Sequence, residues 1–155
     1  MRVLITGATG FLGFRLVEKL NLDFRYKQII ASGRVIKKTH YIKSDKVKYI
    51  TGNLTDPIFV DELTKKIDIV INCAALSSPW GSISDFTQAN IITQKNLIKS
   101  CIYNKVKTFI FISSPSIYFD LKNKLNIYES DPLPKKFINN YARSKFEAEE
   151  LLRSS

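Results

Sequence analysis

The chain of 155 residues has few of the residues on which metal and disulfide chemistry depend. It contains one histidine, His40, and two cysteines, Cys73 and Cys101. A single histidine does not supply the ligand set of a zinc site, so no metal site is expected. Both cysteines lie in apolar stretches, which predicts reduced core thiols and a cytoplasmic location.

Long apolar runs are also missing, and none approaches the roughly 20 residues that a membrane-spanning helix needs. The opening residues, MRVLITGATG, enter a β-like segment without the length or cleavage pattern of a signal peptide. We therefore expect no membrane span. Apolar residues make up 45% and charged residues 25% of the chain, as in ordinary globular proteins. The length predicts one domain, residues 1–155.

Negative charge is in deficit, and the formal net charge is +10. A basic balance suggests nucleic acid as a partner. However, the lysines are scattered, and aromatic residues are not interleaved with them as a base-stacking surface requires. We expect a solvated basic surface and no specific nucleic-acid site; some affinity for polyanions stays open.

Strand-like and helix-like segments alternate along the chain. The expected strands are residues 2–6, 28–32, 47–51, 68–74 and 108–114, the last two as buried strands. The expected helices are residues 11–20, 57–66 and 84–104, and one that starts near Phe137 or Asn140. Residues 121–136 are polar and are expected to form a loop. This alternation predicts an α/β fold with a doubly wound parallel sheet, which binds ligands beyond the carboxyl ends of its strands.

Three glycines follow the first expected strand in the sequence TGATGFLG. Gly7 permits a tight turn, Gly10 lets the backbone approach a pyrophosphate, and Gly13 lets the helix pack close to the sheet. The start of the helix offers free N–H groups and a partial positive charge to phosphates. The alternative is a tight strand-to-helix turn without a ligand, but the position of the motif favours nucleotide binding.

The second strand ends in ASGR, so Arg34 stands where the adenosine ribose of a dinucleotide would lie. An acidic residue there selects NAD, whereas an arginine accommodates a 2′-phosphate. Arg34 therefore favours NADP(H), with NAD(H) possible. The alternative is that Arg34 is only a surface residue.

Tyr141 and Lys145 are four residues apart on the last expected helix, so they share one face of it. A nearby cation lowers the pKa of a tyrosine, and a drop of about three units corresponds to about 4 kcal/mol. Such a tyrosine can act as an acid or base near neutral pH. Taken alone, the pair is a weak signal and favours the alternative, a solvated start of a helix.

Several segments together resemble the extended short-chain dehydrogenases/reductases, the NAD-dependent epimerase/dehydratase family. TGATGFLG is similar to their cofactor signature, GNLTD (52–56) to their adenine segment, and NCAA (72–75) to the segment beside the nicotinamide ribose. The family usually has Asp where Asn53 stands, and often has Gly-Thr where Thr93 and Gln94 stand. The resemblance implies a Rossmann fold. It also implies these cofactor contacts: Gly7, Thr9, Gly10, Phe11, Leu12, Gly13, Arg34, Asn53, Leu54, Ala74, Ala75, Asn90, Tyr141 and Lys145.

The segment ISSPSIY resembles the family's strand with the catalytic Ser or Thr, and counting back four from Tyr118 selects Ser114. The resemblance implies hydride transfer at a carbinol or carbonyl carbon. Tyr141 would donate or take the proton, Lys145 would hold the nicotinamide ribose, and Ser114 would bind the substrate oxygen. Ser113 is the rival for the serine role, but alternation along a strand points it the other way.

Residues 113–134 and SSPWG (77–81) resemble the 3β-hydroxysteroid dehydrogenase-like branch, which includes 2-alkyl-3-oxoalkanoate reductases. This implies an apolar substrate, steroid-like or long-chain acyl. Trp80 either walls the substrate pocket or packs under a loop. The runner-up is a nucleotide-sugar epimerase. Dehydration is disfavoured, because Pro115 and Ser116 replace the Asp-Glu pair of dehydratases.

The family continues beyond the Tyr-Lys helix into a C-terminal substrate domain that this chain lacks, so a cofactor-binding fragment without turnover is another hypothesis. The resemblance also implies a homodimer through the fourth and fifth helices, residues 84–104 and 137–153. The side chains expected to face a partner are Phe86, Ile91, Leu97, Ile98, Phe146 and Leu151.

Overall fold

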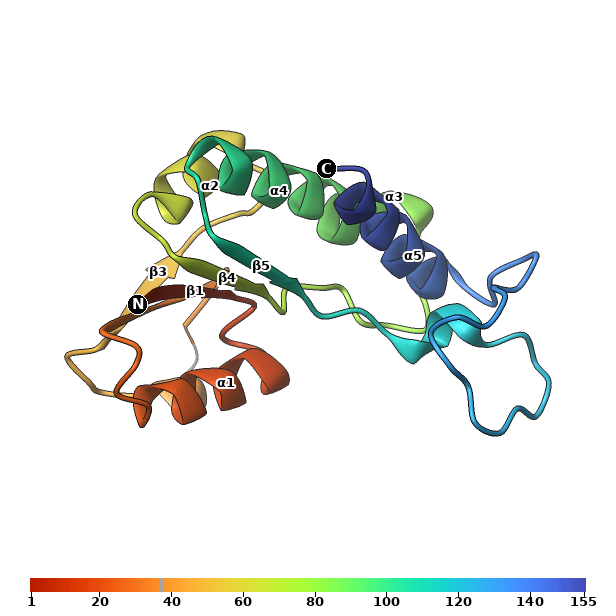
Figure 1. Cartoon of the computed structure of the whole chain (residues 1–155), viewed down its shortest axis with the longest axis horizontal. Helices are drawn as coiled ribbons and strands as arrows, with labels where there is room; N and C mark the ends of the chain where they lie inside the picture. Colours follow the sequence, from red (N-terminus) through yellow and green to blue (C-terminus); the bar gives the residue numbers. More distant parts are fainter. Residues whose placement is uncertain (37) are drawn as a thin grey trace.

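The computed structural model describes residues 1–36 and 38–155 as a five-stranded, wholly parallel sheet (Figure 1). The strands are β1 (Arg2–Thr6), β2 (Gln28–Gly33), β3 (Val47–Thr51), β4 (Ile69–Asn72) and β5 (Thr108–Phe111). Their order is β3-β2-β1-β4-β5, so the direction of winding reverses between β1 and β4. This confirms the predicted doubly wound α/β fold, and the reversal marks the place where such sheets bind ligands.

Helices cover both faces of the sheet. The helices are α1 (Phe11–Asn21), α2 (Pro57–Thr64), α3 (Ile83–Phe86), α4 (Thr93–Tyr103) and α5 (Asn140–Arg153). Helix α1 lies on one face, and α2, α4 and α5 lie on the other (Figure 1). The short helical segments are the 3₁₀ turns η1 (Lys38–His40) and η3 (Pro115–Tyr118) and the π-helix η2 (Thr87–Ile92).

Two apolar clusters, one on each face, hold these layers together. Val3 and Ile5 of β1 pack with Val17 of α1, whereas Leu4 packs on the opposite side with Leu63 of α2. Each of these side chains is almost fully buried. Burying one such side chain contributes about 1.5–3 kcal/mol. The central strand β1 is therefore apolar on both faces, as its continuous apolar sequence predicts.

The start of α2 was predictable from its first residues. Asp56 precedes the helix, and its Oδ1 accepts from the backbone N–H of Ile58 at 2.9 Å. Pro57 occupies the first helical position, where no intrahelical donor is needed. The helix ends at Thr64 and not near Lys66, because Lys66 has a left-handed φ of 59°.

The prediction of a buried strand over residues 108–114 was wrong in length and in burial. Strand β5 ends at Phe111 and lies at an edge of the sheet. Ile110 is 43% exposed, because α1 packs mainly on β1 and β2 and does not extend over β5 (Figure 1). The apolar sequence of β5 is the same whether one face or both are covered, so the pattern alone could not reveal the edge.

The helix predicted over residues 84–104 runs from 83 to 103, but it contains the π-helical segment η2. This segment is wider than an α-helix, and such segments occur often at functional sites. Asn90 lies in η2 and is buried. No composition signal marks a π-helix, and the sequence did not predict it.

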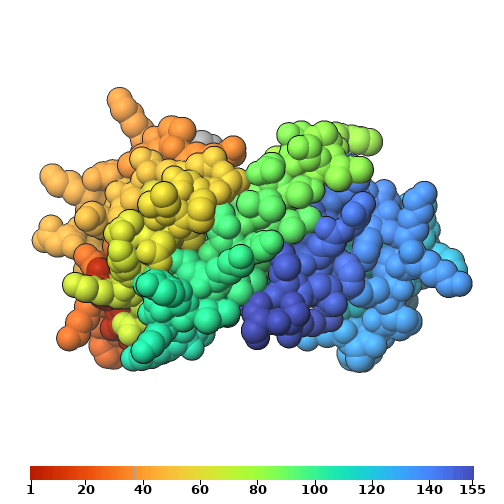
Figure 2. Space-filling view, turned by 90° about the horizontal axis from the view of Figure 1, so that it is seen from above, coloured from red at the N-terminus to blue at the C-terminus, as the bar shows by residue number. Residues whose placement is uncertain are grey.

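Three of the side chains that were expected to face a second subunit lie in the core instead. Phe86, Leu97 and Ile98 are buried, and the Phe86 ring packs near that of Tyr141, with 6.3 Å between ring centroids. The reason is that the long helix packs its apolar face on the sheet and on α5. Figure 2 shows α4 and α5 side by side across this face of the molecule.

Candidate cofactor site

A cleft of about 990 Å³ lies along the carboxyl ends of the strands. Its walls come from the turns after β1, β2, β3 and β4 and from the segment α3–η2. Of the predicted cofactor contacts, these line it: Gly7, Thr9, Gly10, Arg34, Asn53, Leu54, Ala74 and Ala75. Its volume reaches the upper end of the range of ordinary ligand pockets.

The glycine-rich turn forms one end of this cleft. Gly7 has a φ of +65°, and a Cβ there would lie 2.7 Å from the backbone of Cys73 and Ala74. A Cβ on Gly13 would lie 2.3 Å from Gly7 O, so α1 packs too close to the turn for any other residue. At Gly10 a Cβ would meet only Gly7 O, at 3.3 Å, which leaves its outer side open to a ligand.

The first turn of α1 has free backbone donors. Gly10 precedes the helix without a side-chain cap, and the first helical bond runs from Phe14 N to Gly10 O at 3.0 Å. The side chains of Phe11 and Leu12 are exposed and do not line the cleft, whereas their N–H groups lie in this first turn. The first turn carries no acidic residue. It therefore has the charge and geometry that suit a phosphate.

The adenosine end of the cleft is formed after β2 and β3. Arg34 is exposed there, and the ion pairs of residues 1–36 and 38–155 do not include it. Asn53 Oδ1 accepts from Thr55 N at 3.1 Å, so one acceptor position of this side-chain amide is already occupied. Asn96 of α4 donates to Leu54 O at 3.1 Å and holds this segment, a contact that the sequence did not suggest.

His40 also contacts the site, although its role was not anticipated. Its Nδ1 lies 3.0 Å from Thr9 O, and its ring lies 4.7 Å from that of Phe14. On the other side, a Cβ at Gly33 would meet the Thr9 side chain at 2.6 Å. Thr9 is thus held between β2 and η1, and the shape of the glycine-rich turn depends on both.

The two serines after β5 have different surroundings. Ser114 Oγ lies 2.8 Å from Ser116 Oγ and accepts from Ser116 N at 3.3 Å, capping η3. Ser113 Oγ is buried, and no hydrogen-bond partner for it exists among the described residues. Both serines are half-buried, and Ser114 is the one whose hydroxyl caps η3, so the choice of Ser114 over Ser113 stays a prediction.

Tyr141 and Lys145 lie near the start of α5, which begins where Asn139 Oδ1 accepts from Ala142 N at 2.8 Å. Lys145 is only 2% exposed, and its Nζ donates to Ile112 O at 2.5 Å, which joins α5 to the end of β5. Burial lowers the pKa of Lys145 to about 8, and the charge of Glu149 opposes this shift. Cys73 lines the cleft, whereas Lys145 does not.

Asn90 lies behind the cleft and not on its wall. Its Oδ1 accepts from Leu76 N at 2.7 Å, and its Nδ2 donates to Leu76 O and to Ser144 Oγ. Ser144 Oγ in turn donates to Tyr141 O at 2.8 Å. The amide is therefore engaged by the protein, and it fixes the segment after β4 relative to the helix that carries Tyr141.

A second set of buried hydrogen bonds also links the end of β4 to α5. Asn72 Oδ1 accepts from Thr6 Oγ1 at 2.5 Å and from Ala74 N, so its Nδ2 must face Gln94 Oε1, at 2.7 Å. Gln94 Nε2 then donates to Ala148 O of α5 at 3.5 Å. The long side chain of Gln94 therefore links Asn72 at the end of β4 to α5.

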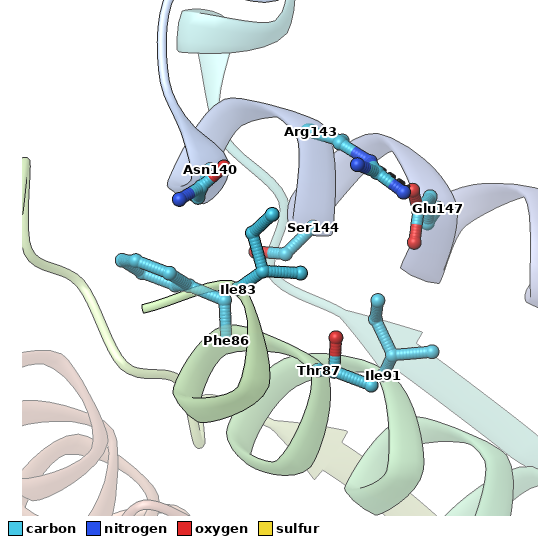
Figure 3. A pocket seen from close by; sticks show the side chains of 8 residues that line it. All are labelled: Ile83, Phe86, Thr87, Ile91, Asn140, Arg143, Ser144 and Glu147. Carbon is cyan, nitrogen blue, oxygen red and sulfur yellow. Dashed lines mark hydrogen bonds and ion pairs between the residues drawn. The ribbon is translucent and has the colours of Figure 1, made fainter. Parts of the chain in front are cut away.

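A much smaller cavity of about 10 Å³ lies between α3–η2 and α5 (Figure 3). Ile83, Thr87 and Ile91 face α5 there, and Arg143 pairs with Glu147 at 2.5 Å on the opposite side. This space holds about one water molecule, so it marks a helix–helix contact and not a ligand site.

Residues 1–36 and 38–155 lack two further kinds of feature. No group of three or more His, Cys, Asp or Glu side chains is placed to hold a metal ion there. In the same part of the chain, no helix combines the length and apolar character of a membrane span.

A model of the NAD dependent epimerase/dehydratase family matches residues 3–155. The chain belongs to this family. The uncharacterized protein YbjS of Escherichia coli is 33% identical over 154 residues, which are 98% of this chain and 45% of that protein. A 2-alkyl-3-oxoalkanoate reductase of Shewanella oneidensis is 29% identical over 148 residues, 96% of this chain and 37% of the reductase. The chain thus spans less than half the length of these family members.

Solved structures show the same fold. The dTDP-glucose 4,6-dehydratase DesIV from Streptomyces venezuelae, solved with NAD and TYD bound, superimposes with a TM-score of 0.89. The match covers 99% of this chain and 51% of the dehydratase, at 21% sequence identity. The predicted family and Rossmann fold are therefore confirmed.

Proposed function

We propose that the cleft binds a nicotinamide dinucleotide, NADP(H) in preference to NAD(H), and that the family member containing this chain transfers hydride at a 3-hydroxy or 3-oxo carbon. One observation carries the proposal: a single cleft at the carboxyl ends of the strands is lined by the glycine-rich turn, by Arg34 after β2 and by Ala74 and Ala75 after β4. It lies where the strand order reverses, which is where sheets of this kind bind a dinucleotide.

The residues present fit this cofactor. Gly10 and the N–H groups of Phe11 to Gly13 border an open space that a side chain at Gly10 would enter. Arg34 has the position and the positive charge to receive a 2′-phosphate. Gly33 and Gly52 line the adenosine end, where a Cβ on Gly52 would collide with the Phe59 ring at 2.4 Å, so the strand ends can pack closely beside the cleft.

When bound, a nicotinamide would supply or accept the hydride. Tyr141 gives a proton to the substrate oxygen during reduction, or takes it during oxidation. Lys145 holds the ribose hydroxyls and favours the phenolate form of Tyr141 through its charge. Ser114 donates its hydroxyl to the substrate oxygen, and Ser116 lies 2.8 Å away to orient that hydroxyl.

The substrate that we propose is apolar, such as a long-chain 3-oxo acid or a steroid-like molecule. Trp80 supports this, because it is 83% exposed and lines the cleft, so it does not pack under a loop. Asn140 fixes the adjacent Gly81 by donating to its carbonyl at 3.2 Å. The polar Ser78, Asp85 and Gln88 share this wall and favour the second candidate, a nucleotide-sugar epimerase.

Calorimetry with NADPH and NADH tests the cofactor assignment. We expect both to bind, NADPH more tightly. Equal affinities, or tighter binding of NADH, would reject the NADP(H) preference. Absence of binding by either cofactor would reject the function itself.

We further propose a homodimer through the outer faces of α3–α4 and α5. Phe86, Leu97 and Ile98 cannot contribute, whereas Ile91, Phe146 and Leu151 are partly exposed. Isologous two-fold pairs are the commonest assemblies. Light scattering at tens of micromolar chain should give twice the monomer mass of 17.8 kDa; a monomer would contradict the proposal.

The free thiols Cys73 and Cys101 support a reducing, cytoplasmic location.

A further inference from the structure

The Lys145 ammonium is buried without a carboxylate beside it. The ion pairs formed within the described residues do not include Lys145, and the nearest acid on its helix, Glu149, pairs with Arg153 at 3.3 Å. Its one recorded hydrogen bond goes to Ile112 O. A buried charge with a single neutral partner is strongly disfavoured unless other groups stabilise it.

An aromatic ring occupies the remaining side of this ammonium. Lys145 Nζ lies 4.0 Å from the centroid of the Phe111 ring, well inside the range of cation–π interactions. Phe111 is the last residue of β5, and Ile112 follows it directly. Two consecutive residues thus present a ring face and a carbonyl oxygen to the same charge.

We propose that Phe111 is a positioning residue of the cofactor site: its ring face keeps the Lys145 ammonium charged and holds it at the end of β5. The consequence for catalysis rests on the proposed function, because a charged Lys145 is what binds a ribose and favours the phenolate of Tyr141. The contact itself does not depend on that function.

Simple packing does not account for the choice of residue. Phe109, two residues earlier, points to the same side of β5 and packs against the apolar cluster of Leu4, Val70 and Cys101. There any apolar side chain of similar size would serve. At Phe111 the neighbour is a cation, and only an aromatic side chain offers it a negative face.

The charged groups around Lys145 all bear on its titration. Glu149 on α5 favours the charged form, whereas burial opposes it. The Cys73 thiol, with a pKa raised to about 11, is neutral near pH 7 and does not balance the charge. With a pKa of about 8, Lys145 is mostly charged at neutral pH, and a loss of stabilisation therefore lowers its charged fraction at physiological pH.

The test measures the titration of Lys145 by NMR in the whole chain labelled with ¹³C at lysine Cε, with the resonance assigned from Lys145→Arg. We expect Phe111→Leu and Phe111→Met to lower the Lys145 pKa by about half a unit to one unit. Phe111→Tyr should restore it. Phe109→Leu is the matched control, since it makes the same change on the same side of β5, and should leave the pKa unchanged.

Two results would overturn the inference: a Lys145 pKa in both Phe111→Leu and Phe111→Met equal to that of the unaltered chain, or a Phe111→Tyr chain that titrates like Phe111→Leu. Using leucine and methionine guards against one variant failing to fold. NADPH titrations between pH 6 and 9 separate the two proposals. If the unaltered chain binds no NADPH, the cofactor function fails, while the NMR titration still decides the role of Phe111. If it binds, affinity should fall at a lower pH in Phe111→Leu.

Discussion

Asn90 holds both backbone polar groups of Leu76, accepting from its N–H at 2.7 Å and donating to its carbonyl at 3.2 Å. Asparagine is suited to this because its amide offers an acceptor and donors on one planar group. These two hydrogen bonds replace those that a neighbouring strand would make to Leu76, which lies beyond the end of β4.

Replacing Asn90 by Ala should therefore destabilise the chain by about 2–3 kcal/mol, since it leaves buried donors and acceptors unpaired. Denaturant unfolding measures this change. Gln88→Ala, in the same π-helical segment but exposed, should stay within about 0.5 kcal/mol of the unaltered chain. Similar losses in both variants would mean that the segment, and not the Asn90 amide, matters.

Arg34→Ala should weaken NADPH binding by roughly ten- to a hundredfold and leave NADH binding nearly unchanged. The reason is that a hydrogen-bonded charge pair with the 2′-phosphate exists only for the phosphorylated cofactor. Calorimetry with both cofactors measures the effect. Arg15→Ala removes the same charge from the exposed face of α1 and serves as the control. A parallel loss for NADPH and NADH would count against the assigned role.

Lys145→Met should stabilise the chain without cofactor at neutral pH while abolishing cofactor binding. The pKa of Lys145 falls from 10.5 to about 8 on folding, so the unfolded chain binds more protons between pH 8 and 10.5. The free energy of unfolding of the unaltered chain therefore increases as the pH rises from 8 to 10.5. Below pH 8 the full free-energy cost of burying the charged Lys145 ammonium is present. The net gain from Met at pH 7 is on the order of 2 kcal/mol after the lost hydrogen bond is counted.

Thermal unfolding of both chains from pH 7 to 10.5 checks this prediction. The stability difference between Lys145→Met and the unaltered chain should shrink as the pH rises. A difference independent of pH would show that burial of the ammonium is not the cause.

Both thiols should resist alkylation in the folded chain. Burial raises the pKa of Cys73 to about 11 and that of Cys101 to about 12, so at pH 8 only roughly one Cys73 thiol in a thousand is ionised. Mass spectrometry after iodoacetamide treatment should find little label until guanidinium unfolds the chain. Rapid labelling of folded Cys73, which lines the cleft, would contradict the raised pKa of this thiol.

The 155 residues assayed alone should bind cofactor but reduce long-chain 3-oxo acids slowly. Correct placement of a substrate can supply roughly 7–11 kcal/mol of a barrier, and this chain spans 45% or less of the relatives described above. Any rate should vanish in Tyr141→Phe. A fast rate from these residues would show that their own cleft is enough to place the substrate, and a rate insensitive to Tyr141→Phe would refute the catalytic assignment.

The sequence predicted the sheet well because its strands are short runs of apolar residues between clear turns. Eight of the predicted cofactor contacts line the cleft, namely Gly7, Thr9, Gly10, Arg34, Asn53, Leu54, Ala74 and Ala75. These residues follow strands directly, and the ends of parallel strands lie at one edge of the sheet. Local sequence was sufficient for them.

The sequence could not predict features that depend on distant segments. Whether Asn90 faces the cleft or Leu76 depends on a π-helical segment, and the partners of Lys145 lie 33 residues away along the chain. Likewise, an apolar side chain such as Phe86 on a helix gives no sign of which neighbour covers it. Such contacts are decided by packing, and packing is a property of the folded chain.

The position of β5 at the edge of the sheet has a consequence for how the chain behaves at high concentration. An edge strand offers unpaired backbone groups to other molecules, and TFIF is apolar enough to form such pairs. Lys105 and Lys107 precede it, and the net charge of +10 makes two chains repel one another. Salt at 0.15 M reduces the range of that repulsion to about 8 Å. Colloidal stability should therefore be greatest at low ionic strength, with edge-to-edge association increasing as salt is added.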